Sequence, residues 1–395
     1  MSANRTLPDF TNTQLAFASK SDKELRATRE LFYMMNKRWL VDLGSKMALW
    51  AVQLDIGFIN NIIKRTIFPQ FCGGETLEES VDDIENLYKY KTLSILDYGA
   101  EAKSTEAAYD ITKEENIKAI KFAREHASVP AMVTKTTGLF DFGLLEKRQM
   151  GKSFTKAEAA KYERSRKRLD EICKMAYDQQ VGIFIDAEES WIQDSIDELA
   201  DEMMAKYNRE KVIVYNTFQM YRKDRLSFLK KSFEKAQANG YMLGAKVVRG
   251  AYMDKERDRA EDMGYPSPIQ DTKEDTDRDF NEAITFCVEN YEQMASCNAS
   301  HNLASCALQS TLIDQMGIDR NHPNLNFCQL LGMSDNITFN LSEAGYNVAK
   351  YMVYGAVGEV APYLIRRAQE NSSVAGDVSR ELHLLNSEIE RRRKS

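Results

Sequence analysis

The sequence predicts an α/β fold: a (β/α)8 barrel of the TIM type that follows an N-terminal helical region. Eight short apolar runs alternate with longer amphipathic segments, as strands and helices do in a parallel sheet. A parallel connection needs a crossover of about a dozen residues or more, and these segments supply that length. Polar side chains follow the runs rather than precede them. A barrel places its active site at that end of its strands, so the same pattern also indicates an enzyme.

The first 90 residues are predicted to be helical. Lys23–Lys37 and Lys46–Thr66 have apolar residues at helical spacing. Thr76–Tyr88 follows a Cys-Gly-Gly loop and carries Asp and Glu in its first turns, which favours a helix start there. The linker into the barrel is expected near Tyr88–Lys91.

The barrel is expected over residues 91–375, followed by a helical tail over 376–395. Insertions are expected around Met150–Ala160 and Tyr252–Glu274 because the runs are unevenly spaced. Lys156–Gln179 and Arg225–Ala238 are clear amphipathic helices between runs. The predicted strands are Thr92–Tyr98, Ala131–Thr136, Gly182–Ala187, Val212–Thr217, Gly244–Val248, Met294–Ala299, Leu325–Leu330 and Val348–Val353.

Composition narrows the function classes. The chain has 395 residues, 43% of them hydrophobic, and a net charge of −7, with no basic block interleaved with aromatics, so nucleic acid is not an expected partner. Six scattered cysteines without a CxxC suit a reducing compartment. With four histidines and no HExxH, no metal site is expected. The polar start predicts no signal peptide, and Arg391–Lys394 is interpreted as a solubilising end.

One segment has two interpretations. Leu43–Phe71 is rich in Leu, Ile, Trp, Phe and Met, but charged and amide residues interrupt it. It therefore lacks the roughly 18 to 20 uninterrupted apolar residues of a spanning helix. The segment is either a helix packed on a domain face or an interfacial anchor on a membrane surface.

An arginine pair near the C-terminus is the strongest single indication of a ligand. The last predicted strand leads to Tyr354, and the helix after it carries Arg366, Arg367 and, one turn later, Glu370. Adjacent helix positions lie about 100° apart, so the two guanidinium groups can hold one small anion from two sides. The alternative is a solvated basic surface in which Arg366 pairs with Glu370.

Polar residues also follow the other predicted strands, and they are costly to bury without partners. Lys135 and the two arginines could clamp a carboxylate or a phosphate, while Asp186 and Tyr354 face the rest of the ligand. Gly250, after a charged strand end, permits a close backbone approach to a ligand. No GxGxxG or Walker motif is present, so a nucleotide cofactor would not use the Rossmann phosphate turn. The polar residues within the later part of the predicted strands or shortly after them are Lys135, Asp186, Glu188, Glu189, Asn216, Lys246, Arg249, Ser300 and His301.

Six motifs, in this order, resemble the proline dehydrogenase family over roughly residues 71–380. Ile95-Leu-Asp-Tyr-Gly99 also resembles the family's first barrel strand, with less specificity. The six motifs are Ile185-Asp-Ala-Glu-Glu189, Tyr215-Asn-Thr-Phe-Gln219, Lys246-Val-Val-Arg-Gly-Ala-Tyr252, Ala299-Ser-His-Asn302, Phe327-Cys-Gln-Leu-Leu-Gly-Met333 and Tyr354…Arg366-Arg367-Ala-Gln-Glu370.

The resemblance implies a distorted (β/α)8 barrel that binds FAD without a Rossmann domain. The implied reaction is oxidation of L-proline to Δ1-pyrroline-5-carboxylate, with hydride passing to the flavin and electrons then passing to a membrane quinone. It also implies hand-off of the product to a separate pyrroline-5-carboxylate dehydrogenase. The implied location is the cytoplasm or the surface of the inner membrane, on the matrix side of the mitochondrial membrane in a eukaryote.

The resemblance assigns roles residue by residue. Lys135, Arg366 and Arg367 match the family's carboxylate clamp. Asp186, Ala251, Tyr252, Leu330 and Tyr354 match the wall of the substrate pocket, with Lys135, Asp186, Tyr354 and the two arginines as the catalytic set. The residues that match flavin contacts are Asn216, Lys246, Val248, Arg249, Gly250, Ser300, His301 and Glu370.

Two departures from the family pattern affect these assignments. Bacterial bifunctional members often have Gln and Arg where this chain has Asn216 and Lys246, which resemble the eukaryotic branch. Ala356 replaces the usual proline after Tyr354. Tyr354 itself is retained, which favours proline over hydroxyproline as the substrate. Two other functions remain open: a Schiff-base lyase or aldolase with Lys135 or Lys246 as nucleophile, and a non-catalytic flavin-binding sensor.

Overall fold

The computed structural model describes residues 7–37, 39, 41, 57–99, 103–373 and 377–394 of the chain. Its strands form one nine-stranded sheet in the order β1-β9-β2-β3-β4-β5-β6-β7-β8, and β9 also pairs with β8. From β2 to β9 the strands follow one another as they do in a (β/α)8 barrel, which confirms the predicted fold class. The strands are β1 Cys72–Gly74, β2 Leu93–Tyr98, β3 Ala131–Lys135, β4 Gly182–Asp186, β5 Val214–Gln219, β6 Leu243–Val248, β7 Met294–Ala299, β8 Leu325–Leu330 and β9 Asn347–Tyr354.

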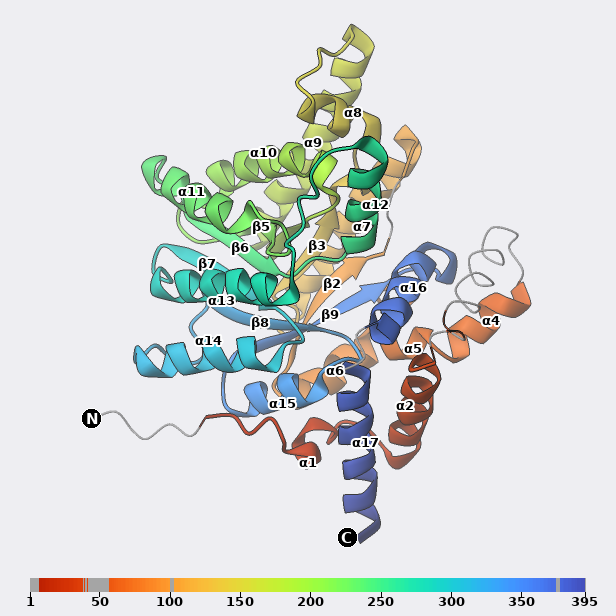
Figure 1. Cartoon of the computed structure of the whole chain (residues 1–395). Coiled ribbons are helices and arrows are strands. Elements are labelled where there is room, and N and C mark those ends of the chain that lie inside the picture. The colour runs from red at the N-terminus through yellow and green to blue at the C-terminus, as the bar shows by residue number, and fades with distance from the viewer. Residues whose placement is uncertain are drawn as a thin grey trace. The chain divides into compact units, whose positions relative to one another are not determined.

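Helices alternate with the strands along the chain (Figure 1). Those before β2 are α1 Thr13–Ala16, α2 Asp22–Met35, α4 Gly57–Arg65, α5 Phe68–Phe71 and α6 Val81–Lys89. Those between β2 and β7 are α7 Glu106–Glu125, a 3-10 turn Thr136–Gly138, α8 Phe142–Gln149, α9 Lys156–Gln179, α10 Ser190–Tyr207, α11 Arg225–Ala238, α12 Met253–Met263 and α13 Lys273–Glu289. The last are α14 Leu303–Gln315, α15 Asp335–Glu343, α16 Val357–Ser373 and α17 Asp377–Lys394.

By internal packing the chain forms two compact units. The first unit is Ala100–Cys328, with β3 to β7 and their helices, and the second unit is Leu7–Gly99 together with Gln329–Ser395. The second unit is therefore discontinuous in sequence. The predicted regions are contiguous in sequence and these units are not, so the predicted boundaries near residues 90 and 375 remain predictions.

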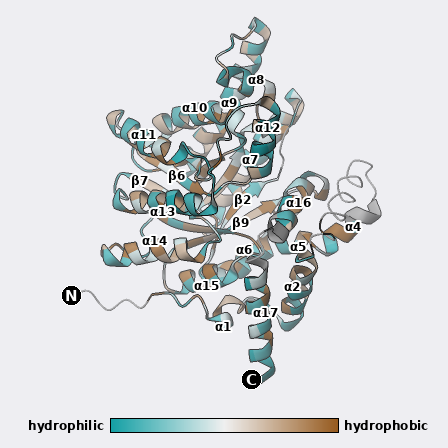
Figure 2. Ribbon diagram, in the orientation of Figure 1, coloured by the Kyte–Doolittle hydropathy of each residue, from teal (hydrophilic) through white to brown (hydrophobic). Residues whose placement is uncertain are grey.

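In the first unit, the strands are parallel and the helices cover them with their apolar sides. Helix α9 begins with a capping box between Thr155 and Glu158 and ends at Gln180 in the left-handed conformation (φ 60°). Its buried face, which includes Leu169 and Ile172, packs beside α7. Figure 2 shows hydrophilic residues along much of the outward side of helices such as α13.

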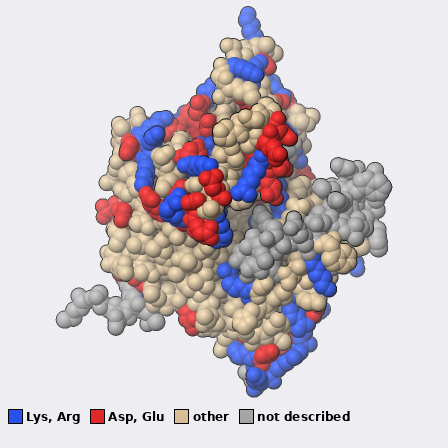
Figure 3. Space-filling view, in the orientation of Figure 1, with Lys and Arg blue, Asp and Glu red and all other residues tan. Residues whose placement is uncertain are grey.

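In the second unit, α17 packs against α1 and α2 (Figure 1). Their shared apolar cluster comprises Ala16, Phe17, Leu25, Phe32, Leu384, Leu385 and Ile389. Arg392 donates to the backbone oxygens of Phe17 (2.8 Å) and Lys20 (2.9 Å) and to Glu388. Burial alone would raise the pKa of Glu388, but bonds from Arg391, Arg392 and Thr13 lower it to about 2. Lys and Arg gather at the end of α17, as the predicted solubilising end implies (Figure 3). Two of them, Arg391 and Arg392, also hold α17 in place through these hydrogen bonds.

The eight predicted strands are confirmed, with ends shifted by no more than two residues. The ninth strand, β1, was predicted as a loop because Cys-Gly-Gly has no strand pattern of its own, and it is defined by its pairing with β9. The predicted helices over Lys156–Gln179 and Arg225–Ala238 are confirmed. Much of Lys46–Thr66 lies outside the described residues. Of the helices within the described ranges, none is both long and apolar enough to cross a bilayer.

Candidate active site

Strand register in the first unit brings three predicted site residues into one layer. Lys135 is paired with Asp186 across β3 and β4. Ile185 of β4 is paired with Asn216 of β5, so the next residues, Asp186 and Thr217, lie level with each other. Thr217 is in turn paired with Lys246 of β6. Registered residues of neighbouring parallel strands point to the same side of a sheet. The side chains of Lys135, Asp186 and Lys246 therefore share one face near the carboxyl ends of the strands.

Lys246 and Asp186 form an ion pair on this face. The Lys246 Nζ lies 2.6 Å from Asp186 Oδ1, and the side chains are 8% and 15% exposed. A charge-assisted bond of this length fixes both groups. The structure therefore makes Lys246 the partner of Asp186, and the carboxylate keeps some exposure at the strand end.

The alternation of β5 separates Asn216 from this face. Asn216 Nδ2 donates to Asp197 Oδ1 of α10 at 2.9 Å, and Asn216 Oδ1 accepts from the Thr217 amide at 2.9 Å. Its side chain is therefore directed into the helix layer, and its predicted contact with a flavin would have to compete with these two bonds.

Gln219 is a polar residue that the sequence-based assignments missed. It lies two positions after Thr217 and so on the same face as Lys246, and it is 2% exposed. Its Oε1 has no hydrogen-bond partner among the described residues. An unsatisfied buried acceptor is costly, so the position suits a ligand that donates a hydrogen bond. Side chains alternate along a strand, and this alternation in the sequence could have identified Gln219 as a residue on the same face as Thr217.

Arg249 and Ser300, two predicted cofactor contacts, are brought together. Arg249 Nη1 donates to Ser300 Oγ at 2.7 Å, its Nε donates to Asp277 at 2.8 Å, and its guanidinium lies 4.2 Å from the Phe280 ring centroid. Burial alone would raise the pKa of Asp277, but bonds from Lys273 and Arg249 lower it. The cation is therefore fixed in direction before any ligand binds.

The backbone at Gly250 requires glycine for a reason within the chain. Its φ is +136°, and a Cβ added there would lie 2.4 Å from the Tyr221 ring. Packing against Tyr221 is therefore enough to require glycine here, and the predicted close approach to a ligand stays a prediction. The other predicted residues of this part, Val248, Tyr252 and His301, are half-buried, and Ala251 is exposed.

A carboxylate ties two of the turns after the strands to each other. Glu188 accepts from the Thr137 amide at 2.9 Å and the Thr137 hydroxyl at 2.6 Å, which joins the turn after Lys135 to the turn after Asp186. The Glu188 amide in turn donates to Gln193, whose amide group donates to Asp197. Glu188 thus connects two strand ends through buried hydrogen bonds.

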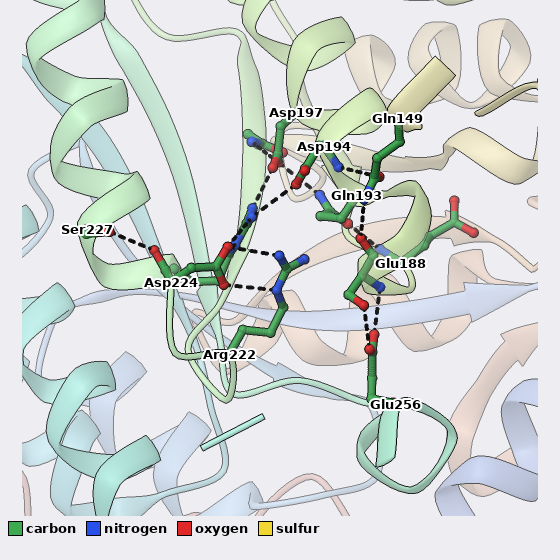
Figure 4. Close-up of polar contacts among 12 residues, drawn as sticks. Gln149, Glu188, Gln193, Asp194, Asp197, Arg222, Asp224, Ser227 and Glu256 are labelled. Atoms are coloured by element: carbon green, nitrogen blue, oxygen red, sulfur yellow. Dashed lines mark hydrogen bonds and ion pairs between the residues drawn. The ribbon is translucent and has the colours of Figure 1, made fainter. Parts of the chain in front are cut away.

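Helix α12 is fastened to α10 across the same region. Glu256, which is fully buried, accepts from both the amide and the hydroxyl of Ser190 at 2.6 Å (Figure 4). Lys255 pairs with Glu189, and Arg259 lies 4.3 Å from the Trp191 ring centroid. Since α12 directly follows the turn Arg249–Tyr252, these contacts also restrain that turn.

The second unit holds the remaining predicted residues. Tyr354 ends β9, is 1% exposed, and its carbonyl accepts from the Gly99 amide at 2.9 Å. Arg367 is 8% exposed and lies 5.4 Å from the ring centroid of Tyr363, one turn earlier on α16. Tyr363 was missed, although its helical spacing from the arginines placed it on their side. Arg366 and Leu330 are half-buried, and the side chain of Glu370 lies outside the described part.

The predicted residues thus fall into two sets. Lys135, Asp186, Lys246 and Arg249 belong to the first unit, and Tyr354 with the arginine pair belongs to the second. The clamp of Lys135 with both arginines therefore stays a prediction. Within the described residues no group of His, Cys, Asp or Glu could hold a metal ion.

Comparison with known proteins gives consistent results. The family model described as proline dehydrogenase matches residues 80–380. A relative named proline dehydrogenase 1, mitochondrial, from Dictyostelium discoideum is 32% identical over 427 residues, covering 96% of this chain and 74% of its own length. A hydroxyproline dehydrogenase from Xenopus laevis is 32% identical over 366 residues, covering 84% of this chain and 78% of its own.

Solved structures show the same fold. Proline utilization A from Bdellovibrio bacteriovorus, inactivated by N-propargylglycine, superposes with a TM-score of 0.74 at 19% identity. The alignment covers 91% of this chain and 41% of that chain, so this chain spans less than half the length of that protein.

Proposed function

Because the chain belongs to the proline dehydrogenase family, we propose that it oxidises L-proline to Δ1-pyrroline-5-carboxylate, with FAD as hydride acceptor and a quinone as final electron acceptor. The ring carbon beside nitrogen loses a hydride, the nitrogen loses a proton, and a C=N bond forms between them. The observation that supports this proposal best is the Lys246–Asp186 pair at the strand ends, with the fixed Arg249–Ser300 pair on the same unit.

The residues of the first unit fit a flavin nucleotide. The ring system of a flavin has both N–H donors and acceptor atoms, and its phosphates are anionic. Gln219 offers a buried acceptor without a described partner, and Lys246 and Arg249 offer cationic donors. We assign Gln219, Lys246, Arg249 and Ser300 to hold FAD, which supplies a hydride acceptor when bound. Val248, Gly250, His301 and Glu370 remain proposed contacts on the resemblance, and Asn216 is the least suitably placed.

For the substrate, the carboxylate supplies most of the binding energy that so small a molecule offers. We assign Arg366, Arg367 and Lys135 to that group, because guanidinium forks match a carboxylate. Tyr363, whose ring lies beside Arg367, offers an apolar ring face next to the arginines, and we propose that the buried Tyr354 ring offers another. Fixing the carboxylate orients the ring, so the chain's contribution to rate is mainly positioning.

The electron acceptor and the location follow from the same proposal. The curated relatives from Dictyostelium, Drosophila and Arabidopsis are named mitochondrial. We propose that this chain works peripherally on a membrane that holds quinone, on the matrix side in a mitochondrion. A separate dehydrogenase specific for the product would complete the oxidation.

Hydroxyproline is a second candidate substrate, since a relative of that name matches most of the chain. Tyr354 argues for proline, because its buried ring leaves less room than a small residue would. The Schiff-base lyase is less favoured. Lys246 donates to a carboxylate at 2.6 Å, which is the arrangement of a paired ammonium and not of an unprotonated nucleophile.

An absorbance spectrum recorded anaerobically tests the proposal. Purified protein supplied with FAD should show a flavin band that bleaches when L-proline is added and bleaches more slowly with trans-4-hydroxy-L-proline. A band that stays oxidised with both amino acids would contradict the proposed substrate class. Absence of any bound flavin, together with borohydride trapping of a ligand on lysine, would favour the lyase.

A further inference from the structure

A hydrogen bond in the second unit joins the end of β2 to the first turn of α16. The Tyr98 hydroxyl donates to Glu359 Oε2 at 2.9 Å. Both residues are half-buried. A bond to a charged acceptor in such a place contributes more than an exposed one. The end of the strand and the start of the helix are therefore held together by more than apolar packing.

Tyr98 also lies against Tyr354. The two residues are paired in register across β2 and β9, and their ring centroids are 5.6 Å apart at an interplanar angle of 40°. The next backbone group, the Gly99 amide, donates to the Tyr354 carbonyl at 2.9 Å. Displacement of the Tyr98 ring would therefore be transmitted to the Tyr354 ring.

The geometry of α16 links Glu359 to the arginine pair. Glu359 precedes Arg366 by seven residues, which is close to two full turns, so both lie on nearly the same side of the helix. The helix start packs tightly on the strand end, because a Cβ at Gly99 would lie 2.5 Å from Val360 Cγ1. A restraint on Glu359 therefore fixes the rotation of α16 about its axis, and with it the direction of Arg366.

We propose that Tyr98 and Glu359 are positioning residues that set substrate selectivity, by fixing the Tyr354 ring relative to the arginines of α16. This inference rests on the proposed function and deepens it. The ligand class is a small cyclic secondary amine with a carboxylate. The arginines hold the carboxylate end, and the Tyr354 ring limits substituents on the far side of the ring. Neither Tyr98 nor Glu359 needs to touch the substrate.

The test uses the full-length, FAD-loaded protein and three variants: Tyr98→Phe, Glu359→Gln and both together. KM and kcat are measured for L-proline and for trans-4-hydroxy-L-proline, and the dissociation constant of a non-oxidisable five-membered cyclic carboxylate is measured from the flavin spectrum. Each single variant should raise the KM for proline about fivefold to tenfold with kcat within about twofold. Discrimination against hydroxyproline should fall by a similar factor. The double variant should resemble the singles, because one bond is removed in each.

Matched controls come from the same unit. Tyr90→Phe removes a hydroxyl that donates to the Ala18 carbonyl at 2.9 Å, and Glu343→Gln removes the charge from an exposed pair with Lys91. Both should leave KM and selectivity at wild-type values. Unchanged KM and selectivity in Tyr98→Phe and Glu359→Gln, or additive effects in the double variant, would overturn the inference. Wild-type protein that oxidises neither amino acid overturns the proposed function, and this inference with it.

Discussion

Two lysine–aspartate pairs, one in each unit, have nearly the same length but different surroundings. Lys246 Nζ lies 2.6 Å from Asp186 in the first unit, and Lys350 Nζ lies 2.7 Å from Asp335 in the second. The side chain of Lys350 is 1% exposed and also donates to the Met333 carbonyl at 2.6 Å. Asp186 is 15% exposed, about twice the 8% of Asp335.

The difference in exposure suggests a different role for each pair. The Lys350 pair holds the turn before α15, where Ser334 has a positive φ of 53° and donates to Glu381 at 3.0 Å. A pair that is so enclosed fixes architecture. The Lys246 pair lies at the carboxyl ends of the strands, and its carboxylate keeps 15% exposure. We therefore expect the Lys350 pair to serve structure and the Lys246 pair to serve the proposed chemistry.

The largest effect should come from breaking the enclosed pair. Lys350→Met removes the lysine that lies 2.7 Å from the buried Asp335 carboxylate and leaves Lys20 at 3.8 Å, so we expect a loss of about 3 to 5 kcal/mol in the free energy of unfolding. Urea unfolding measures this. Lys91→Met, which removes an exposed pair with Glu343, should cost less than about 1 kcal/mol. Equal losses in the two variants would contradict the distinction.

Breaking the accessible pair should affect activity more than stability. Lys246→Met should lower kcat/KM for proline about 100-fold, which is about 2.7 kcal/mol. It should destabilise the fold less than Lys350→Met, because Asp186 retains contact with solvent. Lys246→Arg keeps the charge and should recover part of the activity. A Lys246→Met enzyme with wild-type kcat/KM would remove this pair from the active site.

Glu381 gives the second unit a dependence on pH. Burial raises the pKa of Glu381 to about 7, and Asp335 adds to this, while Arg380, Lys350 and the Ser334 amide oppose it. The folded state then binds this proton more tightly than the unfolded state, whose value is near 4.5. The stability from this group is complete below about pH 4.5 and is lost as pH rises through about 7.

Glu381→Gln should therefore flatten the stability profile of the protein. Between pH 5 and pH 8, the wild type should lose on the order of 2 kcal/mol more than the variant does. Urea midpoints at the two pH values measure the difference. Parallel profiles would mean that Glu381 does not retain its proton in the folded state.

The smallest effect is expected in the first unit, at the fastening of α12. Glu256→Gln keeps the shape but loses the charge that accepts two bonds from Ser190, so the local stability of α12 should fall by about 1 kcal/mol. Hydrogen exchange in Met253–Met263 should become faster while the global urea midpoint stays unchanged. Glu261→Gln, on the exposed side of the same helix, should leave the exchange rates as they are.

The sequence was sufficient for the strands and the helices that have a clear apolar period. It was insufficient where the pairing of a strand with its neighbour, or the direction of a side chain, determines the structure. The short strand β1 has no pattern of its own, and β5 continues to Gln219, two residues beyond the predicted end at Thr217. Asn216 was assigned on the family resemblance, and Gln219 was left out although the alternation of the longer strand places it on the same face as Lys246. The roles of Glu188 and Gly250 depend on partners far away in sequence, Thr137 and Tyr221.

The apolar cluster shared by α1, α2 and α17 has a consequence for biosynthesis. Leu25 and Phe32 are made before Leu384, Leu385 and Ile389, against which they pack and which lie more than 350 residues further along the chain. The apolar faces of α1 and α2 therefore lack their contact with α17 until more than 350 further residues have been synthesised. Such an intermediate needs protection from aggregation during synthesis, so chaperone supply should limit the yield of this protein in a foreign host.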